Sequence, residues 1–337
     1  MPKFFNIVLT IDGTDMDIDQ AKIKEQWGNV ARLQRWVSVL DVTAQITHYE
    51  AGIGTRPDEF IPGSVAGVNL ESRVIEAYRT AQRDCAHAFD KGLTPRLYIF
   101  GFSRGAFAAR WLASLIDFCG IPPMKESEQL AIKAFRSHDV ALAKSLSTQH
   151  GYKNVPIEML GVWDTVQTTF TEDFGIQTLP ACVNAAYHAL AIDECRNAFS
   201  PTRFISDSRV TEVWFAGSHT DIGGGYSGRG LPETTLAWMC DRAREHGLLF
   251  VDHAPSESKP MSQKISYILH NSLTGPWKLL PHAARTIATT DLLHPSVPTM
   301  HEQLPGYAPT NLPAHPQSWH NNLNKTLFIQ NNATLSI

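Results

Sequence analysis

The chain has 337 residues, of which 43% are hydrophobic, so it can bury a large core as one elaborated domain or as two. Its net charge of −4 at neutral pH argues against a nucleic-acid partner, and we expect none. Its five cysteines are scattered and form no Cys-x-x-Cys pair, which argues against a disulfide framework and a zinc site.

The N-terminal region lacks the long apolar segment of a signal peptide, and no run of about 18 apolar residues occurs anywhere in the chain. We therefore expect a protein that is cytoplasmic as synthesised, with export open only to a system that needs no signal peptide. Residues 4–11 predict an apolar strand that is buried on both faces. Asp12, Gly13 and Thr14 follow it at the edge where open α/β sheets bind ligands, although a simple turn braced by Asp12 explains them equally well.

Helical and strand patterns alternate along the rest of the chain. We expect helices over residues 20–40, 70–89, 106–119, 125–150, 185–199 and 231–246, and strands over 44–49, 97–100, 156–163 and 212–216. This alternation predicts an α/β fold with a mostly parallel sheet covered by helices on both faces. We expect one domain over residues 1–320, with a helical insertion at 124–152 that caps the site or forms a plain surface hairpin. Residues 321–337 are predicted to form a tail or an edge strand.

The segment Gly101-Phe-Ser-Arg-Gly105 is a Gly-x-Ser-x-Gly motif between a predicted strand and a predicted helix. A nucleophilic serine must stand on a tight, strained turn, and glycines two residues before and after it avoid a collision where strand meets helix. Ser103 is therefore the predicted nucleophile. The amide of Arg104, with amides of the Asp12-Gly13-Thr14 loop, is expected to hold the oxyanion. A glycine-rich turn with a solvated serine is the alternative.

A serine hydroxyl needs a histidine to accept its proton and an acid to hold that imidazole in the right tautomer. Polar residues follow directly after three predicted apolar strands, and these are Ser103, Asp164 and His219. Their order along the chain is that of α/β hydrolases, which predicts a triad of nucleophile, acid and base on an α/β-hydrolase-like fold. Asp221 is the alternative acid, and His294, late in the chain, is the alternative base.

Two other kinds of function are compatible with the same residues. Asp12, Asp164, His219 and Asp221 gather at one predicted sheet edge, as the ligands of a metal-dependent hydrolase would. A binding module that kept the fold and lost the chemistry is the second alternative. For the serine mechanism we expect no cofactor and no metal. Three charged residues of the predicted helix at 185–199 are expected to form a buried ion-pair network at a helix end. They are Asp193, Glu194 and Arg196.

Several strings stand in one order along the chain, and together they are far more specific than the serine motif alone. They are Asp12-Gly-Thr14, Gly101-Phe-Ser-Arg-Gly-Ala106, Gly161-Val-Trp-Asp-Thr-Val166, His188-Ala-Leu-Ala-Ile-Asp-Glu194, His219-Thr-Asp-Ile-Gly-Gly-Gly-Tyr226, His294-Pro-Ser-Val297 and Tyr307-Ala-Pro-Thr-Asn-Leu312. In these strings the chain resembles the DUF2235 family of α/β hydrolases, the catalytic domain of Tle1-type phospholipase effectors of type VI secretion systems. The resemblance covers nearly the whole chain.

The resemblance implies hydrolysis of carboxylic esters, with phospholipids as substrates, and it implies the three triad residues in the roles given above. It also makes a secretion-system protein and an immunity protein candidate partners, and it allows peripheral contact with a membrane. Four positions depart from the usual residues of the family: Ile11 replaces phenylalanine, Ala216 replaces proline, Ser218 replaces valine and Cys195 replaces arginine. None of these changes removes a reacting group.

Overall fold

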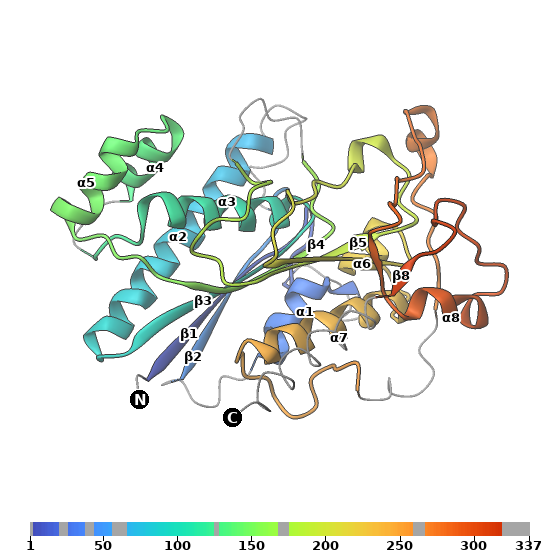
Figure 1. Cartoon of the computed structure of the whole chain (residues 1–337), viewed down its shortest axis with the longest axis horizontal. Helices are drawn as coiled ribbons and strands as arrows, with labels where there is room; N and C mark the ends of the chain where they lie inside the picture. The colour runs from blue at the N-terminus through green and yellow to red at the C-terminus, as the bar shows by residue number, and fades with distance from the viewer. Residues whose placement is uncertain are drawn as a thin grey trace, which may run out of the picture.

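An eight-stranded sheet forms the centre of the computed structural model, which describes residues 3–19, 26–37, 44–55, 66–124, 128–167, 175–258 and 267–318. Its strand order is β2-β1-β3-β4-β5-β6-β7-β8, and each neighbouring pair is parallel (Figure 1). The strands are β1 (Phe4–Ile11), β2 (Gln45–Glu50), β3 (Thr94–Phe102), β4 (Ile157–Trp163), β5 (Ala186–Ala191), β6 (Val210–Phe215), β7 (Leu292–Leu293) and β8 (Gln317–Ser318). A parallel arrangement brings all carboxyl ends to one edge of the sheet.

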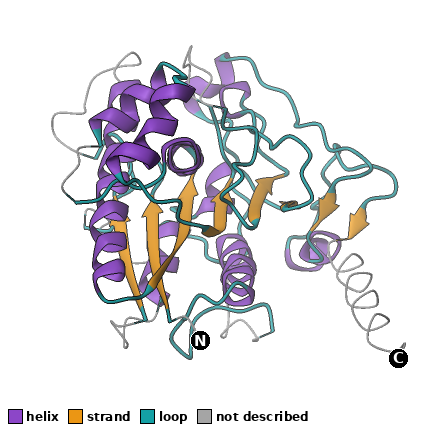
Figure 2. Cartoon of the chain, turned by 60° about the vertical axis from the view of Figure 1, so that its left-hand side comes forward, coloured by secondary structure: helices purple, strands orange, loops and turns teal. Residues whose placement is uncertain are grey.

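Helices cover both faces of this sheet (Figure 2). They are α1 (Asn29–Trp36), α2 (Ala66–Asp90), α3 (Arg104–Cys119), α4 (Gln129–Arg136), α5 (Val140–His150), α6 (His219–Gly223), α7 (Gly230–Glu245) and α8 (Ser296–Gln303), with short 3-10 helices η3 (Asn197–Phe199) and η4 (Gly275–Leu279). The predicted fold class, an α/β-hydrolase-like fold with a parallel sheet between two helical layers, is confirmed.

The side chains of β1 explain how the two layers are held. Phe5, Ile7, Leu9 and Ile11 belong to the hydrophobic core that also contains the buried residues of α2 and α3. Val8 points to the other face and belongs to the core formed with α1 and α7. Successive side chains of a strand point to opposite faces, so a strand covered on both sides needs apolar residues at both sets of positions. In β1 only the buried Asn6 and Thr10 are polar.

Most predicted elements are confirmed, with shifted ends. The strand predicted at 44–49 is β2, the strand at 212–216 is β6, and the helix at 231–246 is α7. Of the helix predicted over 20–40, the described part is α-helical only over Asn29–Trp36. Gln26 is in a 3-10 turn, residues 27–28 are not helical, and residues 20–25 and 38–40 lie outside the described residues. The C-terminal segment 321–337 also lies outside them.

The helix predicted over residues 185–199 was wrong. Residues Ala186–Ala191 form strand β5, which pairs in parallel with β4 on one side and β6 on the other, and only Asn197–Phe199 form a short 3-10 turn. The alanines of this segment have high helix propensity, but their small, buried side chains also fit a central strand between two covered faces. Pairing with two neighbouring strands therefore overrides the local preference.

The insertion predicted within 124–152 consists of α4 and α5. Its buried side chains, among them Ala131, Ala134 and Leu146, join the same core as α3, so this pair of helices is packed onto the domain. Its role as a cap stays a prediction, as does the single-domain organisation. No helix among the described residues has the length and apolar character needed to cross a membrane.

Candidate active site

The turn between β3 and α3 carries Ser103 in a strained backbone conformation, with φ 58° and ψ −124°. Such geometry is rare for a residue with a side chain and is typical of a nucleophile on a sharp elbow. The flanking glycines are dictated by space. A Cβ on Gly101 would lie 2.5 Å from the carbonyl oxygen of Gly105, and a Cβ on Gly105 would lie 2.3 Å from the carbonyl oxygen of Asp12. The motif is therefore required by the way this turn packs.

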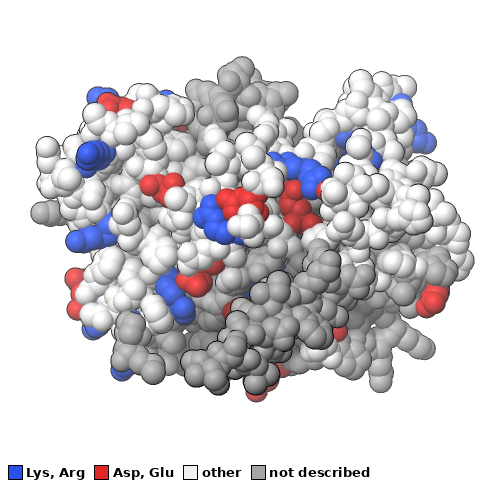
Figure 3. Space-filling model, in the orientation of Figure 1, with Lys and Arg blue, Asp and Glu red and all other residues white. Residues whose placement is uncertain are grey.

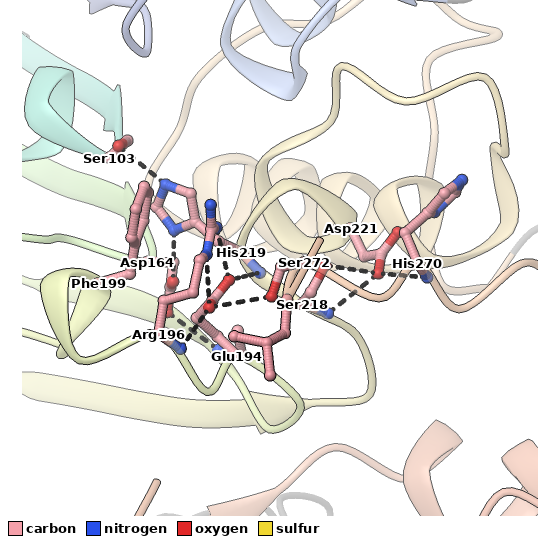
Figure 4. Close-up of polar contacts among 12 residues, drawn as sticks. Ser103, Asp164, Glu194, Arg196, Phe199, Ser218, His219, Asp221, His270 and Ser272 are labelled. Carbon is pink, nitrogen blue, oxygen red and sulfur yellow. Dashed lines mark hydrogen bonds and ion pairs between the residues drawn. The ribbon is translucent and has the colours of Figure 1, made fainter. Parts of the chain in front are cut away.

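Ser103, His219 and Asp164 form a continuous chain of hydrogen bonds (Figure 4). His219 Nε2 lies 2.8 Å from Ser103 Oγ, and His219 Nδ1 lies 2.6 Å from Asp164 Oδ2. An ionised carboxylate can only accept, so Nδ1 donates to Asp164 and Nε2 is left to accept the serine proton. The three residues follow β3, β4 and β6, and they meet at the carboxyl edge of the sheet although they are far apart in sequence.

Asp164 is held by an arginine that sequence analysis did not single out. Arg285 donates from Nη1 to Asp164 Oδ1 at 2.6 Å and from Nη2 to Oδ2 at 2.9 Å, and both side chains are buried. Burial alone would raise the pKa of Asp164, but the charge of Arg285 and the hydrogen bonds from His219 and Arg285 hold it well below its ordinary value. The acid therefore stays ionised at any pH near neutrality.

Two aromatic rings flank the imidazole of His219. The ring centroid of Phe102 lies 4.7 Å from that of His219, and the centroid of Phe199 lies 4.9 Å away in an edge-on arrangement. Arg285 also donates to the carbonyl of Phe199 at 2.6 Å, which ties this aromatic flank to the acid. His219 itself is the first residue of the short helix α6.

The predicted ion-pair group lies at the end of strand β5, directly behind His219. Glu194 forms a buried salt bridge with Arg196, accepts the backbone amide of His219 at 3.3 Å, and accepts the hydroxyl of Ser272 (Figure 4). Asp193 is not part of this pair, because it accepts the amide of Gly217 and the hydroxyl of Tyr307. The Glu194–Arg196 pair therefore supports the backbone of the candidate base.

The Asp12–Thr14 loop lies against the serine elbow, since the carbonyl of Asp12 is close to Gly105. The Asp12 carboxylate accepts the amide of Gly13 and the hydroxyl of Tyr49, each at 2.8 Å. Burial raises the pKa of Asp12 to about 6, against the lowering effect of these two hydrogen bonds. The hydroxyl of Thr14 is buried with no hydrogen-bond partner among the described residues.

The alternative acid and base contact other residues. Asp221 accepts the amide and hydroxyl of Ser218 and pairs with His270, whose Nδ1 lies 2.6 Å from Asp221 Oδ1. His294 lies 2.9 Å from a carboxylate oxygen of Glu257 and stacks on a phenylalanine ring. Neither residue replaces a member of the hydrogen-bonded chain.

The metal-site hypothesis needs its four side chains to converge, and the structure does not bring them together. Asp12 faces Tyr49, Asp221 faces His270, and only Asp164 and His219 are in contact. Within the described residues, no set of three or more histidine, cysteine or acidic side chains is arranged to hold a metal ion.

The residues that sequence analysis missed are Arg285, Phe199 and His270. Arg285 stands in a loop-rich, proline-rich region with no periodic pattern, 121 residues from the aspartate that it contacts. The one available signal was that residues 258–290 contain no aspartate or glutamate, so an arginine there must find its carboxylate elsewhere in the fold.

Comparisons with known proteins find similarity to the following three proteins, among others. An uncharacterised protein of Saccharomyces cerevisiae, YEL023C, is 30% identical over 131 residues, which are 34% of this chain and 18% of that protein. The crystal structure of an uncharacterised Pseudomonas aeruginosa protein is 20% identical, with a TM-score of 0.46, over 74% of this chain and 47% of that one. The Tle1 effector bound to the VgrG spike is 20% identical, with a TM-score of 0.42, over 68% of this chain and 52% of that one.

The chain thus spans about half or less of the length of each of these proteins. Residues 6–242 match the family model described as the type VI secretion phospholipase effector Tle1-like catalytic domain. That match covers well over half of the sequence and includes all three residues of the hydrogen-bonded chain. The chain therefore belongs to the family of Tle1-like phospholipase effector catalytic domains of type VI secretion systems, also called DUF2235.

Proposed function

We propose that this chain is a serine-dependent carboxylic ester hydrolase that acts on phospholipids. The observation that carries the proposal is the unbroken chain of hydrogen bonds from Asp164 through His219 to Ser103, built on a strained elbow. Ser103 is the nucleophile, His219 the general base and Asp164 the orienting acid. Family membership supports the ester as the bond that is cleaved.

The reaction proceeds in two steps. Ser103 Oγ attacks the carbonyl carbon of the ester while His219 Nε2 takes the hydroxyl proton, and the resulting imidazolium returns that proton to the leaving alkoxide as the C–O bond breaks. Water, deprotonated by His219, then attacks the acyl-enzyme and releases the carboxylate and free Ser103. Asp164, ionised and held by Arg285, stabilises the imidazolium in both steps without taking its proton.

The oxyanion that forms in each step needs two donors. The amide of Arg104, at the start of α3, follows the nucleophile directly and is the first donor. The amide of Gly13 already donates to Asp12, so Thr14 is the second donor that we propose, through its amide or its unpaired hydroxyl. Of the oxyanion donors predicted in the Asp12–Thr14 loop, this assignment keeps only Thr14.

The family description supports phospholipid as substrate and secretion as destination. The solved Tle1 effector is bound to a VgrG spike, and we propose a spike protein of this kind as a delivery partner of this chain. Co-purification with the VgrG protein of the same organism tests that partner, and repeated failure to co-purify at physiological salt would argue against it.

The central experiment compares Ser103→Ala with Ser114→Ala. Ser114 lies on α3, where its hydroxyl donates to the helix carbonyl of Arg110 and to no other group among the described residues, so it is a matched control. Turnover of a short-chain p-nitrophenyl ester should fall by about 10,000-fold or more in Ser103→Ala and stay within about twofold in Ser114→Ala. A fluorophosphonate probe should label the wild type and the control, but not Ser103→Ala.

Three outcomes would argue against the proposal. Full turnover in Ser103→Ala would show that Ser103 is not the nucleophile. Activity that is lost in EDTA and restored by a divalent ion would favour the metal-dependent mechanism. No labelling of Ser103 in folded wild-type protein, together with no ester turnover, would favour a binding module.

A further inference from the structure

Residues 274–281 form a projection, here called the finger, with the short helix η4 at its centre. Figure 1 shows η4 as the orange segment that stands out at the upper right of the molecule. Leu279 is 89% exposed, more than any other large hydrophobic side chain of the described residues, and its neighbour Leu280 is 48% exposed. Two adjacent leucines at the tip of a projection are costly in water unless something covers them.

The base of the finger is joined to the candidate active site through aromatic contacts. The ring of Trp277 lies 5.4 Å from that of Phe199, and Phe199 lies 4.9 Å from the ring of His219. The guanidinium of Arg196 lies over both aromatic rings, 3.6 Å from the centroid of Phe199 and 5.0 Å from that of Trp277. Whatever the finger contacts is therefore brought next to the catalytic imidazole.

The finger also lies in a long stretch of the C-terminal region without negative charge. Residues 258–290 contain no aspartate or glutamate, and the exposed Lys278 stands between Trp277 and the two leucines. On the face seen in Figure 3, the outer part of the upper-right projection shows uncharged and basic atoms and no acidic ones. Such a tip is complementary to an anionic surface.

We propose that the finger docks this protein on the surface of an anionic phospholipid bilayer. Leu279 and Leu280 enter the acyl-chain boundary, while Trp277 and Lys278 lie at the level of the headgroups, the positions where these residue types are favoured. A convex tip of two leucines suits a fluid lipid surface. A specific protein interface buries about 800 Å² on each partner and needs a broader matching patch. The proposal rests on the proposed function, since docking on a bilayer brings phospholipid esters to the active site.

Binding is measured with Ser103→Ala protein, so that the vesicles are not consumed. The probe is sedimentation with vesicles of phosphatidylglycerol and phosphatidylcholine, compared with vesicles of phosphatidylcholine alone. The finger variant is Leu279→Asp with Leu280→Asp. The matched control is Leu249→Asp, because Leu249 is also 48% exposed and its backbone contacts Gln45 at the opposite edge of the sheet.

Partitioning onto the mixed vesicles should fall by about tenfold or more in the finger variant and by less than about twofold in the control. Lys278→Glu should weaken binding to the anionic vesicles more than to the neutral ones. With Ser103 present, the ratio of vesicle hydrolysis to soluble-ester hydrolysis should fall by about tenfold in the finger variant, because a soluble ester does not need docking.

Equal vesicle binding by wild type and finger variant would overturn the proposal, and so would an equal loss in the Leu249→Asp control. If the wild type binds no vesicle and the finger variant instead abolishes self-association in gel filtration, the finger meets a second copy and the proposal is wrong. Vesicle binding that depends on the finger in a protein with no ester turnover would overturn the proposed function alone.

Discussion

Two aspartate–histidine pairs lie close together on the carboxyl side of this sheet, and their bonding distances are the same. Asp164 and His219 are 2.6 Å apart, and so are Asp221 and His270 (Figure 4). The first pair contacts a serine hydroxyl on a strained elbow and is buried. The second contacts Ser218, is stacked on Tyr226, and has a partly exposed imidazole. The difference lies in what surrounds each pair.

An aspartate that orients a histidine is therefore not by itself a catalytic unit. Asp164 forms an ion pair with the buried Arg285, which keeps its carboxylate ionised and fixed in position. Nε2 of His219 contacts the hydroxyl of Ser103. Asp221 is used to begin a helix, because its carboxylate caps the amide of Ser218 in the turn that carries His219. The second pair thus supports the first by holding its backbone.

The largest expected contrast is between His219→Ala and His270→Ala. The first removes the general base and should lower kcat/KM for a p-nitrophenyl ester by about 10,000-fold. The second removes only a partner of the helix cap and should change it by less than about threefold. Steady-state kinetics on both variants, with circular dichroism to confirm folding, makes the comparison. Similar losses in the two variants would show that the pairs act as one unit.

The next contrast is between the two carboxylates. Asp164→Asn should lower kcat by about 1,000- to 10,000-fold, because an amide cannot hold the imidazole tautomer that accepts the serine proton. Asp221→Asn keeps the triad but removes acceptors from the helix cap, so it should cost about 1–2 kcal/mol of the free energy of unfolding. Urea unfolding and ester kinetics on both variants separate the two effects. A stability loss without a kinetic loss in Asp164→Asn would reverse the assignment.

The smallest expected effect, and the most specific, concerns Arg285. Arg285→Met should lower kcat/KM roughly 10- to 100-fold at neutral pH by loosening Asp164 and Phe199. Without the guanidinium, only His219 opposes the effect of burial on Asp164 and the pKa of Asp164 rises, so the acidic limb of the pH–rate profile moves to higher pH. If the Arg285 salt bridge has no role in the site, the acidic limb of the profile will not move in Arg285→Met. Arg209→Met, which breaks the partly exposed pair with Asp207, is the control.

The sign of the stability effect follows from the same pair. The pKa of Asp164 is lower in the folded protein than its ordinary value of 3.8, so its contribution to stability is present above that value and is lost as pH falls through the folded pKa. Acid unfolding should therefore begin at a higher pH in Arg285→Met than in the wild type. An unchanged acid transition would contradict the electrostatic role of Arg285.

Local spacing in the sequence was enough to predict the parts of the site that depend on neighbours along the chain. The glycines around Ser103 are required by contacts within one strand–turn–helix unit and with the adjacent β1, so the motif could be recognised without coordinates. The apolar residues of β1, which are interrupted only by Asn6 and Thr10, likewise predicted burial on both faces. Asp164 could be named because it follows β4 directly, and His219 because it lies four residues after the end of β6.

What the sequence could not decide are the contacts between segments that no period or spacing relates. Strand β5, whose alanines favour a helix, becomes a strand because β4 and β6 pair with it on both sides, and this places the end of β5, with Glu194, behind His219. Arg285 reaches Asp164 across 121 residues. Which histidine each of Asp164 and Asp221 contacts likewise depends on their positions in three dimensions. Side-chain identity sets what a residue can do, whereas only the packing of distant strands and loops sets which partner it meets.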